Sequence, residues 1–395
     1  MTRPVTSAST APAPAPGPTR ISAHGGRAAW IMLASGWSAN QFSALLGAYR
    51  SNLGLSESTV TGLFAVYVVG LIPALLVAGP MADRRGRRSV ALVALALNVL
   101  STLLLMAGGL WATWLLLPGR FLTGVSAGAL LAAGSAWIKE LSGSPRRSGL
   151  FVSAGFATGG LGAALIAEWA PWPMVTAYVP HVLLGLVAGL MAVREPETRT
   201  VPATVPAPVG GHPSRAFRRE VLAVAPWIFT APTIGFVTLP GTLHAGLIFT
   251  GVATAVVPGV GLLTARRAVA SPVPGLLTVA VGTAMAAGAA GAGSAVLALP
   301  AAAVLGAGYG LTLTYGLTRT VALAPPHQLA GWTARFWTAA YVGMFTPYVI
   351  TLVSRAVPVP AVLVGVAVLA ALTAWPTSRG SAPAPAGSRP TAGLQ

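Results

Sequence analysis

The sequence contains no cysteine and very few charged residues. The absence of cysteine excludes a disulfide framework, a cysteine-ligated metal site and a thiol nucleophile. Only 8% of the 395 residues are charged, whereas soluble globular domains average about 25%. We also find no Walker-type phosphate loop, no cluster with metal-ligand spacing and no serine–histidine–aspartate set. These absences predict a protein that is not an enzyme and that needs no cofactor.

Long apolar runs dominate the sequence instead. Apolar residues make up 54% of the chain, and the mean hydropathy is +0.74. Runs that stay apolar over about 20 residues predict membrane-spanning helices, because the strands of a membrane barrel would alternate. The predicted fold class is all-α, a polytopic membrane protein with twelve transmembrane helices. The predicted spans are 28–49, 58–82, 89–109, 113–138, 148–168, 172–193, 220–241, 246–264, 272–292, 295–318, 328–353 and 357–376.

The spans divide into two predicted halves of six helices each, residues 28–193 and 220–376. Between them, residues 194–219 are charged and proline-rich, which predicts an extended cytoplasmic linker. Residues 1–27 and 377–395 are rich in alanine, proline and serine, and we expect them to be disordered cytoplasmic tails.

The two halves resemble each other when the first is shifted by 182 positions. Keeping one offset across several helices indicates duplication and pseudo-symmetric halves. Parallel repeats of this kind are a known transporter architecture, with the binding site near the midplane between the halves. The landmarks that coincide include Gly79 with Gly261, Arg84–Arg85 with Arg266–Arg267, Pro118 with Pro300, Gly124 with Gly306, and Gly128 with Gly310.

The formal net charge of +17 indicates membrane topology here. On a soluble protein it would suggest nucleic-acid binding, but most arginines lie in short loops between apolar runs. With a cytoplasmic N-terminus, every basic residue outside the predicted spans except Arg50 and Arg355 falls on the cytoplasmic side. We therefore predict a multi-pass protein of the plasma (inner) membrane with both termini cytoplasmic and no nucleic-acid partner.

Residues 79–88, between the second and third spans, form the most specific motif. A segment this charged cannot remain in hydrocarbon, so we expect a tight loop at the cytoplasmic surface. Its residue types, spacing and place match the loop signature of the major facilitator superfamily, which the chain resembles over roughly 28–376. The resemblance implies that Asp83 clasps the opposite half and the loop arginines; alternatively, the arginines only anchor topology. The signature residues of this gating loop are Gly79, Asp83, Arg84, Gly86, Arg87 and Arg88.

The fourth span carries Arg120-x-x-x-Gly124-x-x-x-Gly128, which looks like a motif of drug/proton antiporter-like exporters in that superfamily. The spacing places the three residues on one helix face, where small residues permit close packing. An arginine in a membrane span is costly and tends to face a cavity or a partner. Arg120 is thus a candidate proton-relay or substrate-facing residue, and the alternative is an arginine that snorkels to the interface.

In the fifth span, Gly155, Gly159 and Gly162 share one face. The first two are similar to the start of the antiporter motif, whereas Gly160 stands where that motif has proline. Close packing against a neighbouring helix is one interpretation, and control of proton leak or direction is the other.

Several polar residues within spans are candidates for the path of substrate or protons. Asn40 and Gln41 lie near the middle of the first span, where substrate contact and hydrogen bonding between helices are both open. Tyr67 is a weaker lining candidate, and Arg335 could face the cavity or snorkel. Two titratable candidates are Glu168, at the outer end of the fifth span, and His181, deeper within the sixth span, although each could be solvated or locally paired.

None of the seven acidic residues falls at mid-membrane in the predicted spans, whereas Arg120 does. A cavity for cations would be expected to hold a carboxylate. We therefore predict a monomeric secondary transporter that moves a small neutral or anionic, partly apolar molecule across the lipid bilayer, with protons as the coupling ion and efflux as the direction. Proton-coupled uptake of a metabolite and a non-transporting scaffold or sensor are the alternatives.

Overall fold

The computed structural model describes residues 24–144, 146–198, 214–267, 269–325 and 328–378, and every regular element within them is helical. Most of the predicted tails and of the predicted linker lies outside these residues; in the C-terminal tail, residues 377–378 end helix α19. The one exception in the N-terminal tail is residues 24–27, which belong to helix α1.

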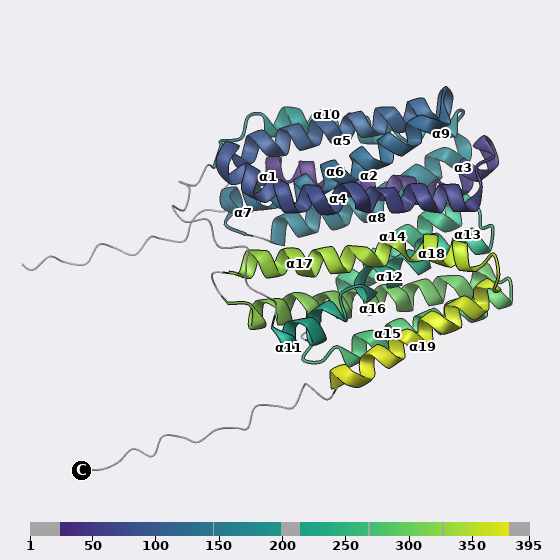
Figure 1. Cartoon of the computed structure of the whole chain (residues 1–395). Helices are drawn as coiled ribbons and strands as arrows, with labels where there is room; N and C mark the ends of the chain where they lie inside the picture. The colour runs from purple at the N-terminus through teal and green to yellow at the C-terminus, as the bar shows by residue number, and fades with distance from the viewer. Residues whose placement is uncertain (1–23, 145, 199–213, 268, 326–327, 379–395) are drawn as a thin grey trace, which may run out of the picture.

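The first half contains ten α-helices and two short irregular helices within the described residues (Figure 1). They are α1 His24–Ala28, α2 Trp30–Ala44, α3 Leu46–Leu53, α4 Glu57–Arg85, α5 Arg87–Leu110, η1 Thr113–Leu115, α6 Leu116–Ala129, η2 Leu130–Gly134, α7 Ser135–Ser142, α8 Arg146–Trp169, α9 Pro173–Thr176 and α10 Val179–Ala192.

The second half follows the same plan within the described residues. Its helices are α11 Arg215–Phe217, η3 Arg218–Leu222, α12 Trp227–Thr233, η4 Ile234–Thr238, α13 Leu239–Thr242, α14 Leu247–Thr264, α15 Val273–Gly291, α16 Ala295–Leu323, α17 Leu329–Val342, η6 Gly343–Phe345, α18 Thr346–Val353 and α19 Val359–Ser378. We call the end that holds the start of α1 and the end of α19 the near end (Figure 1). The opposite end, with α3, α9 and α13, is the far end.

Ten helical stretches in the described residues are long and apolar enough to cross a membrane. The other two predicted spans coincide with α2–α3, which is interrupted at Leu45, and with α19, whose apolar part Val359–Trp375 is shorter. The all-helical membrane fold is therefore confirmed, and the count of twelve crossings stays a prediction.

Large apolar side chains on the outside of the bundle agree with a lipid environment. Val77, Val93, Leu190 and Leu372 are each 60% exposed or more. In water such exposure over many helices would be unfavourable, whereas hydrocarbon tails solvate it at no cost. The chain is a multi-pass membrane protein.

Glycines create equivalent helix contacts in the two halves. In the first half, Gly124 and Gly128 of α6 lie against the backbone of α4, because a Cβ on either would stand 1.8 or 2.3 Å from a carbonyl oxygen of α4. In the second half, Gly306 and Gly310 of α16 lie as close to carbonyl oxygens of α14, at 2.5 and 2.2 Å. The repeated glycines of the sequence therefore mark the same pair of helices in each half.

The two halves lie side by side with their long helices roughly parallel (Figure 1). They pack through α8 and α14, where a Cβ on Gly160 would meet Thr254 Oγ1 at 2.2 Å and one on Gly251 would meet Ala164 at 2.5 Å. Two apolar cores are shared by both halves, and one joins Phe42 and Val60 to Phe236 and Val257. The interface between the halves is therefore packed in its middle.

The prediction of a loop over residues 79–88 is wrong in its extent, because the loop is much shorter. Helix α4 continues through Arg85 and α5 begins at Arg87, so only Gly86 is non-helical. Gly86 has a φ of 103°, which an L-residue rarely adopts, and this single residue reverses the chain.

Candidate functional site

A small central cavity lies between the halves, with a volume of about 50 Å³. Its lining includes no charged side chain and is rich in aromatic rings. Within this lining, Phe229 and Tyr341 stack with ring centroids 4.6 Å apart at an angle of 14°. The residues that line it are Ala39, Asn40, Ser43, Tyr67, Phe156, Phe229, Pro232, Thr233, Phe236, Pro258, Tyr309, Tyr341 and Met344.

Three phenol groups of this cavity have unused hydrogen-bonding capacity. The hydroxyls of Tyr67, Tyr309 and Tyr341 accept from and donate to none of the described residues. Aromatic rings supply apolar contact area and the hydroxyls supply a polar handle. A ligand with both an apolar body and hydrogen-bonding atoms would fit this lining.

Asn40 joins the two halves at the cavity wall. Its Nδ2 donates to the carbonyl of Phe156 at 2.9 Å and to that of Thr254, in the second half, at 3.5 Å. The neighbouring Gln41 lies elsewhere: it is fully buried within the first half, and its Nε2 donates to Thr102 Oγ1 at 3.3 Å. Of the predicted Asn40–Gln41 pair, the structure brings only Asn40 to the cavity.

Arg120 is completely buried beside the cavity. Its Nε donates to the carbonyl of Leu63 at 3.3 Å, and its Cζ lies 4.2 Å from the ring centroid of Phe42 and 5.0 Å from that of Tyr67. Among the described residues, neither Nη1 nor Nη2 has a hydrogen-bond partner. The guanidinium is therefore held by cation–π contacts in place of a carboxylate, and Tyr67 contacts both it and the cavity. Because its guanidinium is completely buried, Arg120 does not snorkel to a membrane interface.

His181 lies at the centre of a buried polar network inside the first half. Its Nε2 is 2.9 Å from Asn98 Oδ1, and its Nδ1 is 2.8 Å from Thr102 Oγ1. Asn98 Nδ2 donates to Ser38 and Ser126, both at 2.8 Å. Because the amide nitrogen of Asn98 is committed to these hydroxyls, its oxygen accepts from Nε2–H of the ring. The network ties α2, α5, α6 and α10 together, and His181 does not line the central cavity.

The polar residues of this network were missed by the sequence analysis. Asn98, Ser101 and Thr102 are fully buried on α5. In the sequence they are recognisable as an amide and two hydroxyls within an apolar run. Such polar groups are costly in a membrane unless each has a hydrogen-bond partner.

Ion pairs gather at the near end of the first half. Asp83 Oδ1 is 2.8 Å from Arg87 Nη2, and Arg87 Nε donates to Glu140 Oε1 at 3.0 Å. Asp83 is half-exposed and contacts no charged residue of the second half within the described chain. Arg84, Arg85 and Gly79 lie on the same last turns of α4, and no atom stands within 4 Å of a Cβ built on Gly79.

Glu197, at the start of the predicted linker, was also missed. Its Oε1 accepts from the backbone N–H of Arg88 at 3.0 Å, and Trp137 donates to the carbonyl of Pro196 at 3.0 Å. Arg88 itself donates from Nη2 to the carbonyl of Val193. The chain beyond α10 is therefore bound to the gating loop. In the second half, Arg319 pairs with Glu220 at 2.6 Å.

The glycines of α8 lie against α2. A Cβ on Gly155 would stand 2.2 Å from the carbonyl of Leu33, and one on Gly159 would stand 2.6 Å from Cα of Trp37. A Cβ on Gly162 would meet the Trp37 ring at 3.0 Å. The positions permit close approach of two helices.

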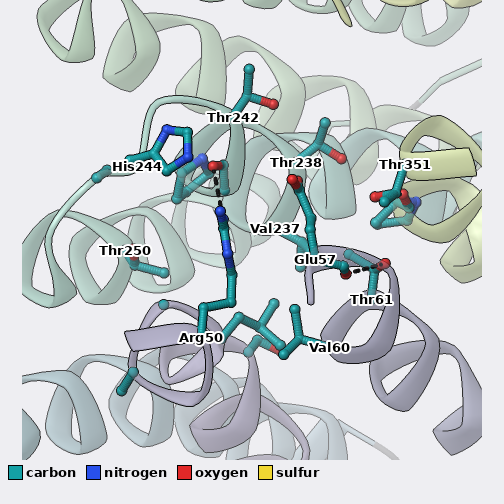
Figure 2. Close-up of a pocket in the computed structure, with 18 of the residues that line it drawn as sticks. Arg50, Glu57, Val60, Thr61, Val237, Thr238, Thr242, His244, Thr250 and Thr351 are labelled. Atoms are coloured by element: carbon teal, nitrogen blue, oxygen red, sulfur yellow. Dashed lines mark hydrogen bonds between the residues drawn. The ribbon is translucent and has the colours of Figure 1, made fainter. Parts of the chain in front are cut away.

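A larger vestibule opens at the far end, with a volume of about 590 Å³ (Figure 2). Both halves line it. Arg50 and Glu57 extend from the first half toward the second, where Thr238 and His244 lie. Arg50 Nη1 donates to the carbonyl of Gly241 at 3.3 Å, so the vestibule contains a hydrogen bond between the halves.

Two predicted residues lie outside both cavities. Glu168 is exposed at the end of α8, and Arg335 is partly buried on α17; neither is among the lining residues. Glu57 is the carboxylate that lines the vestibule. The sequence does not distinguish Glu57 from Glu168, because each lies at the outer end of a predicted span, Glu57 just before the second and Glu168 at the close of the fifth.

Two helical halves around a shared cavity define a class of protein, the secondary membrane transporters built from parallel repeats. The family model of the Major Facilitator Superfamily matches residues 28–346. The chain belongs to the major facilitator superfamily, and it is a membrane transport protein.

Curated relatives match only part of the chain. A protein of Klebsiella pneumoniae subsp. pneumoniae named multidrug resistance protein MdtL is 34% identical over 97 residues, which is 25% of this chain and 24% of that protein. The MdtL protein of Shigella flexneri serotype 5b is 34% identical over 98 residues, 25% of each chain. The match thus spans about a quarter of these relatives' length.

Solved structures resemble the whole fold. A POT family transporter in complex with 5-aminolevulinic acid has a TM-score of 0.72 at 11% identity, covering 90% of this chain and 96% of that chain. A D-xylose–proton symporter has a TM-score of 0.66 at 15% identity, covering 89% and 95%. At these identities the likeness establishes the fold alone.

Proposed function

We propose that this protein moves a small neutral or anionic, partly apolar molecule across the membrane by alternating access, as proton-coupled efflux. The observation that carries the proposal is the central cavity between the halves: its described lining has aromatic walls and no charge, and its three phenol hydroxyls have no hydrogen-bond partner among the described residues. The described lining holds no carboxylate, so a cation in the cavity would have only aromatic faces to offset its desolvation. The substrate, protons and the lipid bilayer are the proposed partners of a monomer.

The proposed orientation places the near end in the cytoplasm of a cell bounded by the plasma (inner) membrane. Its support is the distribution of arginine, because the gating-loop arginines, Arg219 and Arg319 all lie toward the near end. Both termini are then cytoplasmic, and the far-end vestibule opens to the outside.

Several residues have proposed roles that follow from their positions. Asn40 and Tyr67 contact substrate, because they line the central cavity. Arg120 acts in proton coupling from behind Tyr67, and Asp83 holds the gating loop in one conformation through its ion pair with Arg87. For proton entry from outside, the vestibule position favours Glu57 over Glu168.

Efflux is the proposed direction because part of the sequence matches proteins named for multidrug resistance. Uptake is the alternative, and it would reverse the dependence on the pH gradient. One neighbour in fold is named a D-xylose–proton symporter, and it is the reason for keeping uptake as the alternative.

The test is transport by purified protein in liposomes under an imposed pH gradient of either sign. The probes are naphthalene-2-carboxamide, 2-naphthoate and 2-naphthylmethylammonium, which differ in charge at nearly constant size. We expect saturable movement of the amide or the carboxylate that reverses with the gradient. Gradient-driven transport of the ammonium alone, or no gradient-dependent movement of any probe, would refute the proposal.

A further inference from the structure

We propose that the far-end vestibule is a second binding site for the transported molecule, and that the ligand it takes is uncharged, partly apolar and able to accept hydrogen bonds. The inference rests on the proposed function, since it names where the substrate binds outside the central cavity. It goes further by adding a site and by choosing the uncharged member of the proposed substrate class.

The first argument is size. The vestibule has a volume of about 590 Å³, whereas the central cavity has about 50 Å³. Pockets that bury small organic ligands typically measure about 300 to 1,000 Å³. Of the two cavities lined by described residues, the vestibule alone is large enough in this conformation for such a molecule. Its apolar wall includes Leu46, Leu55, Val60, Val237 and Ile350.

The second argument is a pair of unused hydroxyls. Most hydroxyls of the wall donate to a carbonyl of their own helix: Thr61 to Glu57 at 2.8 Å, and Thr351 to Pro347 at 2.9 Å. Ser43 is fully buried and Thr238 is 8% exposed, yet neither hydroxyl has a partner among the described residues. A buried hydroxyl without a partner is unfavourable, and an acceptor atom of a bound ligand would relieve it.

These two hydroxyls come from different halves of the protein. Ser43 belongs to α2 and Thr238 to η4. A ligand that accepts from both would bridge the halves at the vestibule floor, which is the geometry expected of a site used during alternating access.

The third argument is charge. Arg50 and Glu57 contribute one charge of each sign, and the guanidinium of Arg50 already donates to the carbonyl of Gly241. The Glu57 carboxylate lies beside the same residue, because a Cβ on Gly241 would stand 3.7 Å from Oε1. A ligand of either charge would be attracted by one of these side chains and repelled by the other. An uncharged ligand avoids this repulsion.

The vestibule and the central cavity share a thin wall. Ser43 and Phe236 line both. Ser43 precedes the interruption of the first span at Leu45, and Phe236 lies in the π-helical segment η4. Helix interruptions and π-segments often mark functional positions where the backbone can rearrange. The wall between the two sites is therefore built from an interrupted helix and a π-segment, where the backbone can rearrange.

The test uses the absence of native cysteine. A single cysteine is introduced as Thr242→Cys in the vestibule of the full chain in liposomes, and its alkylation by a membrane-impermeant maleimide is timed with and without naphthalene-2-carboxamide. We expect the amide to slow alkylation at least 5-fold, with 2-naphthoate and 2-naphthylmethylammonium much less effective. Adding Ser43→Ala and Thr238→Val should raise the concentration of amide that gives half-maximal protection about 10-fold, because each substitution removes one hydrogen-bond donor.

Thr283→Val is the matched control. Thr283 is equally buried, but its hydroxyl donates to Val279 at 2.8 Å and it lines neither cavity. Its protection should equal that of the parent. Absence of protection by the amide, equal protection by the ammonium, or full protection in the Ser43→Ala/Thr238→Val variant would overturn the vestibule site. Protection without gradient-driven transport would support the vestibule and refute the proposed function; transport without protection would do the reverse.

Discussion

The carboxylate of Glu197 lies directly against Gly86. A Cβ on Gly86 would stand 2.4 Å from Glu197 Oε2, and Glu197 Oε1 accepts from the first turn of α5 at the N–H of Arg88. A negative charge at this position also interacts favourably with the helix dipole at the N-terminus of α5. Glycine at position 86 therefore meets two requirements, a positive φ and space for the carboxylate that caps α5.

Replacing Gly86 by alanine should destabilise the near end of the first half. Strain at a φ of 103°, together with the displaced carboxylate, should lower the free energy of unfolding by about 1–3 kcal/mol. The measurement is the thermal unfolding midpoint of purified protein. Gly149→Ala is the control, because Gly149 is helical and has no atom within 4 Å of a built Cβ. Equal midpoints for the two variants would contradict this account.

Asp83→Asn should impair transport without unfolding the protein. The Asp83 side chain is 53% exposed in its 2.8 Å pair with Arg87, and such pairs contribute at most about 1 kcal/mol. We expect at least a 10-fold loss of transport in liposomes at an unchanged unfolding midpoint, with Asp83→Glu recovering part of the activity. Full activity of Asp83→Asn would remove the gating role.

Arg120→Gln should weaken the coupling of transport to the proton gradient while substrate still crosses the membrane. Glutamine can still donate to the carbonyl of Leu63, but it removes the charge that packs on Phe42 and Tyr67. We expect gradient-driven accumulation to fall at least 10-fold while exchange of substrate across the membrane persists. Comparison of the two assays on the same vesicles is the measurement, and equal loss in both would contradict a role in coupling.

His181→Ala should destabilise the first half strongly. It leaves Asn98 Oδ1 and Thr102 Oγ1 without their ring partner in a fully buried network, at about 1–1.5 kcal/mol for each lost hydrogen bond. The unfolding midpoint should fall clearly. His244→Ala, at an exposed position, should leave it nearly unchanged. A stable His181→Ala variant would show that the network contributes little.

Arg50→Ala should loosen the far end, because the side chain provides a hydrogen bond from the first half to Gly241 of the second. Spin labels at Asn52→Cys and Ala356→Cys, introduced into a chain with no other cysteine, would report the distance between the halves. We expect the distribution to shift toward longer distances. Arg355→Ala, an exposed arginine at the same end, is the control and should not shift it.

Much of this protein could be derived from its sequence because the controlling interactions are local. A run of about 20 apolar residues must form a helix in lipid, since no water is present to satisfy its backbone. The glycines of the fourth span and their repeats at Gly306 and Gly310 likewise follow a spacing that places them on one helix face. The fold class, the two halves and the family all depended on such regularities.

The tertiary structure decided which polar residues meet. Asn40 and Gln41 are neighbours in sequence, yet one lines the central cavity and the other binds Thr102 inside the first half. Glu57 lines the vestibule and Glu168 does not. Composition determines that a helix forms. The rotation of that helix about its own axis is determined by the helices packed against it, and those contacts join residues far apart in the chain.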